Sequence, residues 1–220
     1  MAESDFQRKP LMYVIGSLDH FFRDRPDVYV SGDMFVYYER GVPESVVAPD
    51  VFVAIGVAKH DRGSYRLWEE GKAPDFVMEI TSESTRLKDQ GMKRGIYALL
   101  NVREYFQFDP TGDYLKPPLL GLRLVDGNYM PIHGIRLPDG ILSLRSEVLG
   151  LDLRLEGDRL RLYNPATGEK LLTHAEAEQA RREAEAKAGK EAAARREAEA
   201  EVERLRAELA RLRGEANNSR

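Results

Sequence analysis

Pro74-Asp75-Phe76-Val77-Met78-Glu79-Ile80-Thr81 is one of the most apolar short runs in the chain, and an acid lies inside it. The run is apolar on both faces apart from its acids, so we expect it to be a strand inside a sheet. A carboxylate in such a strand is costly unless a positive group compensates it. Glu79 is therefore predicted to contact a cation. The plainer alternative to a functional site is a buried ion pair with an arginine.

A second acid begins a similar run, Pro49-Asp50-Val51-Phe52-Val53-Ala54-Ile55. Successive side chains of a strand point to opposite faces, so Glu79 shares a face with Val77 and not with Met78. If the two strands are neighbours, the Asp50 carboxylate would lie beside Glu79. Two carboxylates, a main-chain carbonyl and several waters suit Mg²⁺. On the Pro-Asp dipeptide alone, Asp50 is interpreted equally well as an ordinary turn residue.

Asp89, Lys93 and Tyr97 recur every four residues in a helix expected over residues 86–100, so they form one stripe. A lysine in this stripe would reach the charge that develops on a phosphorane or orient the attacking water. Asp89 and Tyr97 are predicted to hold its ammonium group in place. Taken alone, the stripe is more simply a solvent-facing ion pair with an aromatic edge.

Four more polar residues near these strands are weaker candidates. Asp33 follows Gly32 at a strand opening and is otherwise explained as a turn acid. The hydroxyl residues after the central run are most simply helix-capping groups: Ser82, Ser84 and Thr85.

Composition excludes several kinds of site. The chain has 220 residues, enough for one ordinary domain and an appendage. It has no cysteine, so disulfides and thiolate metal sites are excluded, and its 4 histidines lack zinc-like spacing. The net charge of −4 gives no bulk argument for nucleic-acid binding. Residues 1–10 are unlike a signal peptide and no apolar run approaches the roughly 20 residues of a spanning helix, so we expect a soluble, cytoplasmic protein without a membrane partner.

Composition also divides the chain near Thr173. We expect a globular domain over residues 1–173, a charged helical tail over 174–214 and a disordered end over 215–220. Within the first region the main expected elements are a helix over 11–22, strands over 28–38, 50–57 and 75–81, a helix over 86–100 and a strand over 104–108. Shorter β-like pieces follow. This order predicts a mixed α/β fold in which a central sheet is flanked by helices.

The tail contains a short apolar seam. Val202, Leu205, Leu209 and Leu212 alternate spacings of three and four, which gives two heptads of a coiled-coil pattern. Upstream, the same frame falls mostly on charged residues, so the seam fades. Two interpretations stay open: a homodimerising coiled coil and a solvated, partly frayed helix.

With these residues in hand, the chain resembles the Uma-two family of bacterial restriction-endonuclease-like proteins. That family is placed within the PD-(D/E)xK phosphodiesterase superfamily. The most specific match is Asp75-Phe76-Val77-Met78-Glu79-Ile80-Thr81-Ser82-Glu83-Ser84-Thr85, which continues through Asp89, Lys93 and Tyr97. Residues 31–38, 48–53 and 104–110 also match, and the resemblance covers residues 10–172.

The resemblance implies a restriction-endonuclease-like fold, a Mg²⁺ or Mn²⁺ cofactor and DNA as partner. It makes Asp50 the acid of the first half-motif and Glu79 the acid of the second, both of them metal ligands. Thr81 occupies the place of the superfamily's motif lysine, so it would contribute at most a main-chain oxygen to the metal. The resemblance then assigns the role of the motif lysine to Lys93 on the following helix.

Three classes of function follow. The leading hypothesis is a metal-dependent endonuclease in which Asp50, Glu79 and Lys93 act together on a DNA phosphodiester. The second is a catalytically inactive nuclease fold that binds or assembles through its helical tail, for which the acidic net charge and the missing strand lysine argue. The third is a metal-dependent hydrolase of a phosphoester that is not a nucleic acid.

Overall fold

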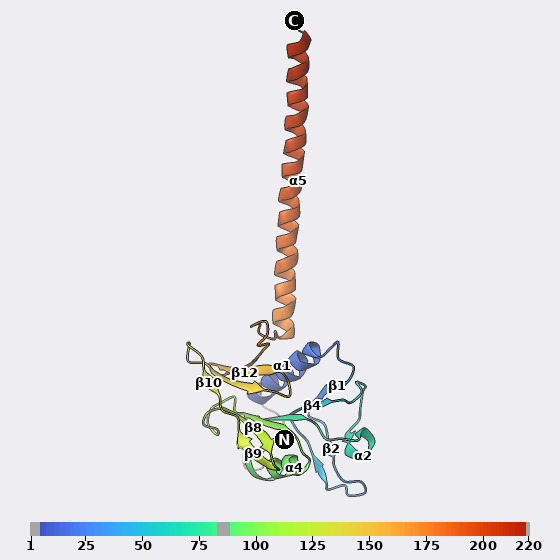
Figure 1. The fold of residues 1–220 in the computed structure, drawn as a ribbon, viewed down its shortest axis with the longest axis vertical. Helices are drawn as coiled ribbons and strands as arrows, with labels where there is room; N and C mark the ends of the chain where they lie inside the picture. Colours follow the sequence, from blue (N-terminus) through green and yellow to red (C-terminus); the bar gives the residue numbers. More distant parts are fainter. Residues whose placement is uncertain (1–4, 83–88, 219–220) are drawn as a thin grey trace. The chain divides into compact units, whose positions relative to one another are not determined.

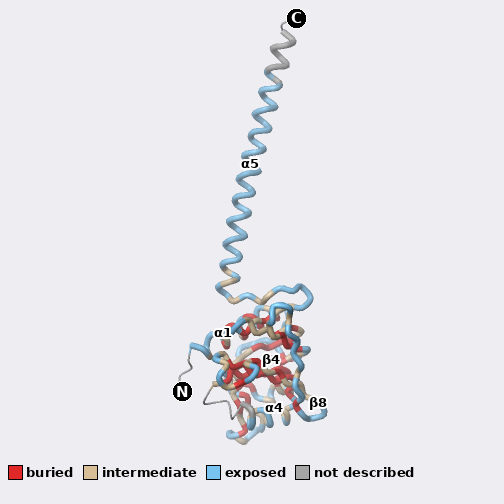
Figure 2. Tube along the Cα trace, turned by 90° about the vertical axis from the view of Figure 1, so that its left-hand side faces the viewer, coloured by how far each residue is buried: buried red, intermediate tan, exposed pale blue. Residues whose placement is uncertain are grey.

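The computed structural model describes residues 5–82 and 89–218, and at 89–90, 210 and 212–218 it describes the backbone alone. The chain separates into two compact units, Met1–Thr173 and His174–Arg220. Figure 2 shows that the buried residues gather on the strands of the first unit.

A six-stranded sheet forms the centre of the first unit (Figure 1). In spatial order its strands are β1 (Val28–Ser31), β4 (Val51–Ile55), β6 (Phe76–Ile80), β7 (Glu104–Phe108), β8 (Leu119–Val125) and β9 (Asn128–Pro131). Only β6 and β7 are parallel among these pairs, and the other four pairs are antiparallel. All five residues of β6 are buried, as its apolar composition predicts.

One face of this sheet packs on a helix and a second sheet. Phe76, Met78 and Ile80 belong to a hydrophobic cluster that includes residues of the helix α1 (Asp5–Phe21). Residues of a four-stranded sheet complete the same cluster. Its strands are β10 (Ile135–Arg136), β11 (Leu142–Ser146), β12 (Leu151–Glu156) and β13 (Arg159–Tyr163).

The opposite face packs against a shorter helix and a three-stranded sheet. Val77 lies in a second cluster with Phe52 of β4 and Tyr97. Tyr97 belongs to α4 (Arg94–Leu99), which continues directly from a π-helical turn, Asp89–Lys93. The small sheet has the order β3 (Val46–Val47), β2 (Val36–Tyr37), β5 (Tyr65–Arg66), and β5 runs into the short helix α2 (Leu67–Glu70). Alternation along β6 therefore places Phe76, Met78 and Ile80 on one face of the sheet and Val77 on the other, as the sequence predicts.

Several elements differ from their expected bounds, and two of these differences have a clear cause in the backbone. The helix α1 begins at Asp5 and not at Leu11, because Pro10 lies inside the helix and does not end it. The expected strand over residues 28–38 is two strands in different sheets, since the backbone turns at Gly32 and Asp33, where the φ of Asp33 is +48°. The mixed α/β fold itself, with a central sheet flanked by helices, is confirmed.

The second unit is one helix, α5 (His174–Asn218). Three of its apolar side chains at seam positions are exposed by about half, Val202 at 46%, Leu205 at 47% and Leu209 at 54%. The helix continues to Asn218, into residues 215–220, for which the sequence predicts a disordered end. Among the described residues, no helix combines the length and the apolar character needed to cross a bilayer.

Candidate active site

The register of two strands brings the two predicted acids opposite each other. Strands β4 and β6 are antiparallel neighbours, with Val51 opposite Met78. The next position along each strand is therefore Asp50 on one and Glu79 on the other. By alternation, both carboxylates point to the face that α4 covers. Asp50 and Glu79 thus meet on one side of the central sheet, as the sequence predicts.

Glu79 is held by two side chains from the following helix. Lys93 Nζ lies 2.7 Å from Glu79 Oε2, and the Tyr97 hydroxyl donates a hydrogen bond of 2.6 Å to Oε1. The Glu79 side chain is only 1% exposed and that of Lys93 is 19% exposed. A lysine therefore contacts this carboxylate, in agreement with the prediction that Glu79 meets a cation.

Tyr97 acts on the acid and not on the ammonium group. Burial raises the pKa of the Tyr97 hydroxyl well above its ordinary value, and the charge and hydrogen bond of Glu79 raise it further. The phenol therefore stays protonated and donates to Glu79. The prediction that Tyr97 holds the ammonium of Lys93 is wrong, because the hydroxyl reaches the carboxylate oxygen instead. The side chain of Asp89, the other predicted holder, lies outside the described residues.

The stripe is also not a solvent-facing one. Tyr97 is 1% exposed and packs in the second cluster, with its ring centroid 5.2 Å from that of Tyr105. Of the apolar residues near the end of this helix, Ile96 and Leu100 pack against the same cluster, whereas Leu99 is 75% exposed. These contacts hold the helix against the face of the sheet that carries Glu79.

Asp50 has a structural contact that joins the two strands. Its Oδ2 accepts a hydrogen bond of 2.6 Å from the backbone N–H of Ile80. This bond continues the β4–β6 pairing beyond the last backbone pair and orients the carboxylate across the strand end. Lys93 Nζ also lies 3.5 Å from the carbonyl oxygen of Ala48, two residues before Asp50. The same lysine therefore contacts β6 and the segment that leads into β4.

Gly32 and Asp33 support Asp50 through the backbone. The Asp33 N–H donates to the carbonyl oxygens of Pro49 and Asp50 at 3.0 and 3.2 Å. A Cβ on Gly32 would lie 2.0 Å from the Asp50 carbonyl oxygen, so the close approach needs glycine. Asp33 itself is exposed, and its contribution to the site is this backbone contact. In the sequence, the Gly-Asp pair inside a β-rich run was the signal that could have identified this role of Gly32.

The hydroxyl residues after β6 fall into two groups. Thr81 is 1% exposed, and its N–H donates to the Phe108 carbonyl at 2.7 Å. Its Oγ1 is buried and has no hydrogen-bond partner among the residues that the structure describes. Ser82 is partly buried one residue further on. Ser84 and Thr85 lie outside the described residues. Thr81 is two residues after Glu79, so by strand alternation its hydroxyl lies on the same side.

The oxygen atoms at this place fit a hard cation. Asp50 and Glu79 supply carboxylates. Thr81 adds a buried hydroxyl oxygen that has no partner among the described residues and could bind a hard cation. Within residues 5–82 and 89–218, no group of three or more His, Asp or Glu side chains is arranged to hold a metal. A metal here would therefore depend on two carboxylates with neutral oxygens and water, as Mg²⁺ sites often do.

Gln107 is a site neighbour that the sequence analysis missed. It lies directly beside Glu79 in the parallel β6–β7 pairing, is 4% exposed, and donates from Nε2 to the Tyr105 hydroxyl at 3.2 Å. Parallel pairing places the two side chains on one face of the sheet. A polar residue within the apolar run 104–108 was the signal, but strand order was needed to connect it with Glu79.

Known proteins resemble this chain in sequence and in fold. Residues 3–156 match the model of the Uma2 family, whose description is "Putative restriction endonuclease". A solved structure from Anabaena variabilis, titled as a "putative nuclease belonging to DUF820", is similar with a TM-score of 0.46 and 9% identity, over 63% of this chain and 75% of that one. No curated protein matches the chain.

Proposed function

This chain belongs to the Uma2 family of restriction-endonuclease-type proteins, and from that premise we propose that it is a Mg²⁺- or Mn²⁺-dependent endonuclease that hydrolyses DNA. Family membership agrees with the resemblance expected from the sequence and supports a hydrolase acting on nucleic acid. One observation carries the proposal: Lys93 Nζ contacts the buried Glu79 carboxylate at 2.7 Å, where Asp50 faces Glu79 from the neighbouring strand.

Asp50, Glu79 and Thr81 would hold the divalent ion. When bound, the ion would polarise the phosphodiester and lower the pKa of the attacking water. The Thr81 hydroxyl favours this assignment, because it has no partner within the described part of the chain, and burying such a hydroxyl costs free energy. The Asp50 carboxylate is already oriented by its hydrogen bond from the Ile80 N–H.

Lys93 would act on the phosphate. The attacking water would release a proton to solvent as its oxygen bonds to phosphorus, and the leaving oxygen would take up a proton as its bond to phosphorus breaks. Meanwhile negative charge grows on the non-bridging oxygens. The Lys93 ammonium, fixed next to Glu79, would donate a hydrogen bond to one of these oxygens. Tyr97 keeps the Glu79 carboxylate oriented, since its hydroxyl stays protonated and donates to Oε1.

Cleavage of plasmid and oligonucleotide DNA tests the proposal. We expect cleavage in Mg²⁺ or Mn²⁺ that stops in EDTA and that falls at least about 100-fold in Glu79→Gln and in Lys93→Met. Lys59→Met is the matched control, because Lys59 also contacts a carboxylate, that of Asp19, at 2.7 Å. This control should cut like the parent protein.

Two results would contradict the endonuclease. Cleavage that survives Glu79→Gln and Lys93→Met together would place any activity elsewhere. A folded parent protein that neither cuts DNA nor binds Mg²⁺ or Mn²⁺ in calorimetry would favour the catalytically inactive binding module. A panel of other phosphoesters separates the endonuclease from a hydrolase of a non-nucleic substrate.

For the tail, we propose that α5 pairs with α5 of a second copy. The exposed Val202, Leu205 and Leu209 side chains support this, because they lie at the seam positions of a heptad pattern. The seam spans two heptads, so the dimer would be weak.

A further inference from the structure

The three-stranded sheet β3-β2-β5 carries an open hollow that the proposed chemistry leaves unused. Its volume is about 470 Å³. Strands, a short helix and the loop between β2 and β3 contribute side chains to it, among them Phe35, Tyr37, Glu39, Ser64, Arg66 and Trp68. The hollow therefore combines aromatic, basic, acidic and hydroxyl groups in a small space.

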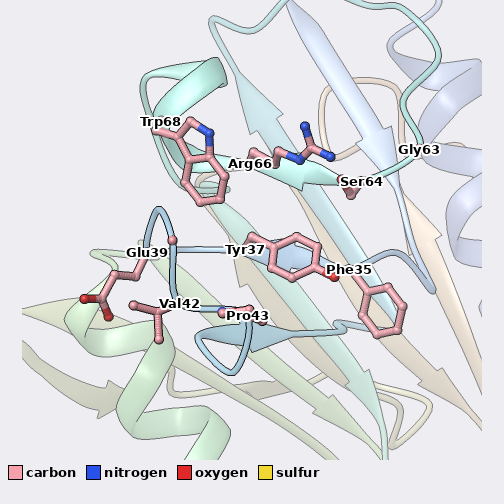
Figure 3. A pocket seen from close by; sticks show the side chains of 10 residues that line it. Phe35, Tyr37, Glu39, Val42, Pro43, Gly63, Ser64, Arg66 and Trp68 are labelled. Atoms are coloured by element: carbon pink, nitrogen blue, oxygen red, sulfur yellow. The ribbon is translucent and has the colours of Figure 1, made fainter.

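Three aromatic rings in the hollow remain open to solvent. Phe35 is 57% exposed, Trp68 is 38% exposed and Tyr37 is half-buried. The rings of Phe35 and Tyr37 are 6.2 Å apart and tilted by 50°. Figure 3 shows Trp68 and Arg66 along one side of the hollow, with Tyr37 and Phe35 across from them. Large rings left open together in a concave surface are typical of a binding site.

The polar groups add hydrogen-bonding capacity and positive charge. Arg66 is exposed and forms an ion pair at 3.0 Å with a similarly exposed carboxylate, that of Glu69. Such a surface ion pair is weak, so its guanidinium can exchange partners at little cost. Glu39 is held by the Ser45 hydroxyl at 3.0 Å and lines the hollow at its other end. Arg40 is exposed in the same loop.

The sheet that carries the hollow and the candidate active site are linked by a short stretch of sequence. Strand β3 ends at Val47, and the next three residues lead to Asp50. The Ala48 carbonyl in this link is the one that Lys93 contacts. Strand β2 begins three residues after Asp33, whose N–H is bound to the same link. The segment that leads into Asp50 is therefore joined directly to the sheet that carries the hollow.

We propose that the hollow binds one unpaired nucleobase of the substrate strand, stacked against Trp68 and Phe35. This inference rests on the proposed nuclease function and adds a preference to it: DNA with a single-stranded or extrahelical base at the cleavage region. Aromatic rings stack on the face of any base, and an arginine guanidinium does the same or contacts phosphate. The Glu39 carboxylate would accept a hydrogen bond from an exocyclic amino group.

Trp68 provides a direct readout, because it is the only tryptophan of the chain. In EDTA, its fluorescence should be quenched by single-stranded DNA and by a duplex with one unpaired base. An abasic strand of equal length and charge should not quench it. Phe35→Ala should weaken this binding about tenfold. Phe6→Ala removes another exposed ring, on α1 and outside the hollow, and should leave the strength of DNA binding unchanged.

A second variant protects the result against a change in fluorescence alone. Trp68→Leu should weaken binding of a labelled single strand to a similar extent, measured by anisotropy. Equal binding of the abasic strand, or binding by Phe35→Ala and Trp68→Leu as tight as that of the parent protein, would overturn the proposal. Tighter binding of a proline-rich peptide that displaces the DNA would also overturn it.

The binding assay tests the base site and the cleavage assay tests the endonuclease, so one proposal can be rejected without the other. Quenching by an unpaired base with no cleavage in any metal would support this hollow and contradict the endonuclease. Cleavage without quenching, unaffected by Phe35→Ala, would leave the endonuclease standing and reject the hollow as a base site.

Discussion

At Glu79 a carboxylate is 1% exposed and each of its oxygens contacts a different side chain. Removing a buried acid from water is costly, and the cost is offset only when the geometry of its partners is good. Lys93 supplies the charge and Tyr97 supplies a neutral donor that resists ionisation. Because Lys93 keeps 19% of its side chain exposed, one partner of the pair stays within reach of a substrate.

The hydrogen bond of Tyr97 to Glu79 can be tested by removing one oxygen atom. We expect Tyr97→Phe to lower the free energy of unfolding by about 1–3 kcal/mol, because Glu79 Oε1 loses a donor that water replaces poorly at a buried position. Chemical denaturation measures this. Tyr38→Phe is the control, a partly buried tyrosine of the same cluster, and should change stability by less than about 0.5 kcal/mol. A Tyr97→Phe protein as stable as the parent would show that this hydrogen bond contributes nothing.

Gly32 is tested by adding a single methyl group. Its Cβ would lie 2.0 Å from the Asp50 carbonyl oxygen and 2.6 Å from Ile15 Cδ1. We expect Gly32→Ala to cost about 1–3 kcal/mol in thermal or chemical unfolding, because a backbone atom must move to admit it. DNA cleavage should fall as well, since Asp50 moves with its carbonyl. Gly16→Ala on α1 meets no atom within 4 Å and should be neutral or stabilising. Unchanged stability in Gly32→Ala would contradict this account of Asp50 placement.

At the scale of elements, the turn after β7 is organised by one buried acid. Asp109 is 1% exposed, and its carboxylate accepts hydrogen bonds from three backbone N–H groups at 3.0 Å or less and from the Thr111 hydroxyl. A further bond comes from the Leu115 N–H at 3.0 Å. Burial by itself would raise the pKa of Asp109, but these hydrogen bonds outweigh it and hold the pKa below its ordinary value.

The depressed pKa of Asp109 predicts how stability depends on pH. Its stabilisation is present above the ordinary aspartate pKa and is lost as the pH falls through the lower folded value. We expect Asp109→Asn to cost about 2 kcal/mol at neutral pH. The difference from the parent should shrink below about pH 4, measured by urea unfolding across pH. Asp113→Asn, an exposed acid of the same loop, is the control. A difference that does not vary with pH would contradict the hydrogen-bonded carboxylate.

At the scale of the whole molecule, the two units differ in how they bury apolar surface. The first unit contains two hydrophobic clusters, one on each face of the central sheet. The tail helix has no buried residue among those whose side chains are described. Helices without a packed face gain little stability from their own backbone, so α5 would gain most from a partner along its seam.

The proposed pairing of α5 predicts a concentration-dependent dimer of the full chain. Sedimentation equilibrium should show it, and Leu205→Glu with Leu209→Glu should convert it to a monomer, because charges would then occupy the seam. Ala207→Glu adds charge at an exposed position off the seam and should leave the dimer intact. A chain that is monomeric at every accessible concentration would favour the solvated helix.

The order of residues was enough to predict the local features: the buried strand with its acid, the assignment of side chains to its two faces, and the spacing that puts Lys93 and Tyr97 on one stripe. These depend on periods of two and about four residues, which the order of residues alone defines. Only the tertiary structure decided the partners. Glu79 meets Lys93 and Tyr97 across 14 and 18 residues, and Asp50 meets Ile80 across 30. Three features depend on strand order and register: the hydrogen bond of Tyr97 to Glu79, the position of Gln107 beside Glu79, and the hollow beside β2. Long-range packing selects strand order and register, and the local sequence pattern does not.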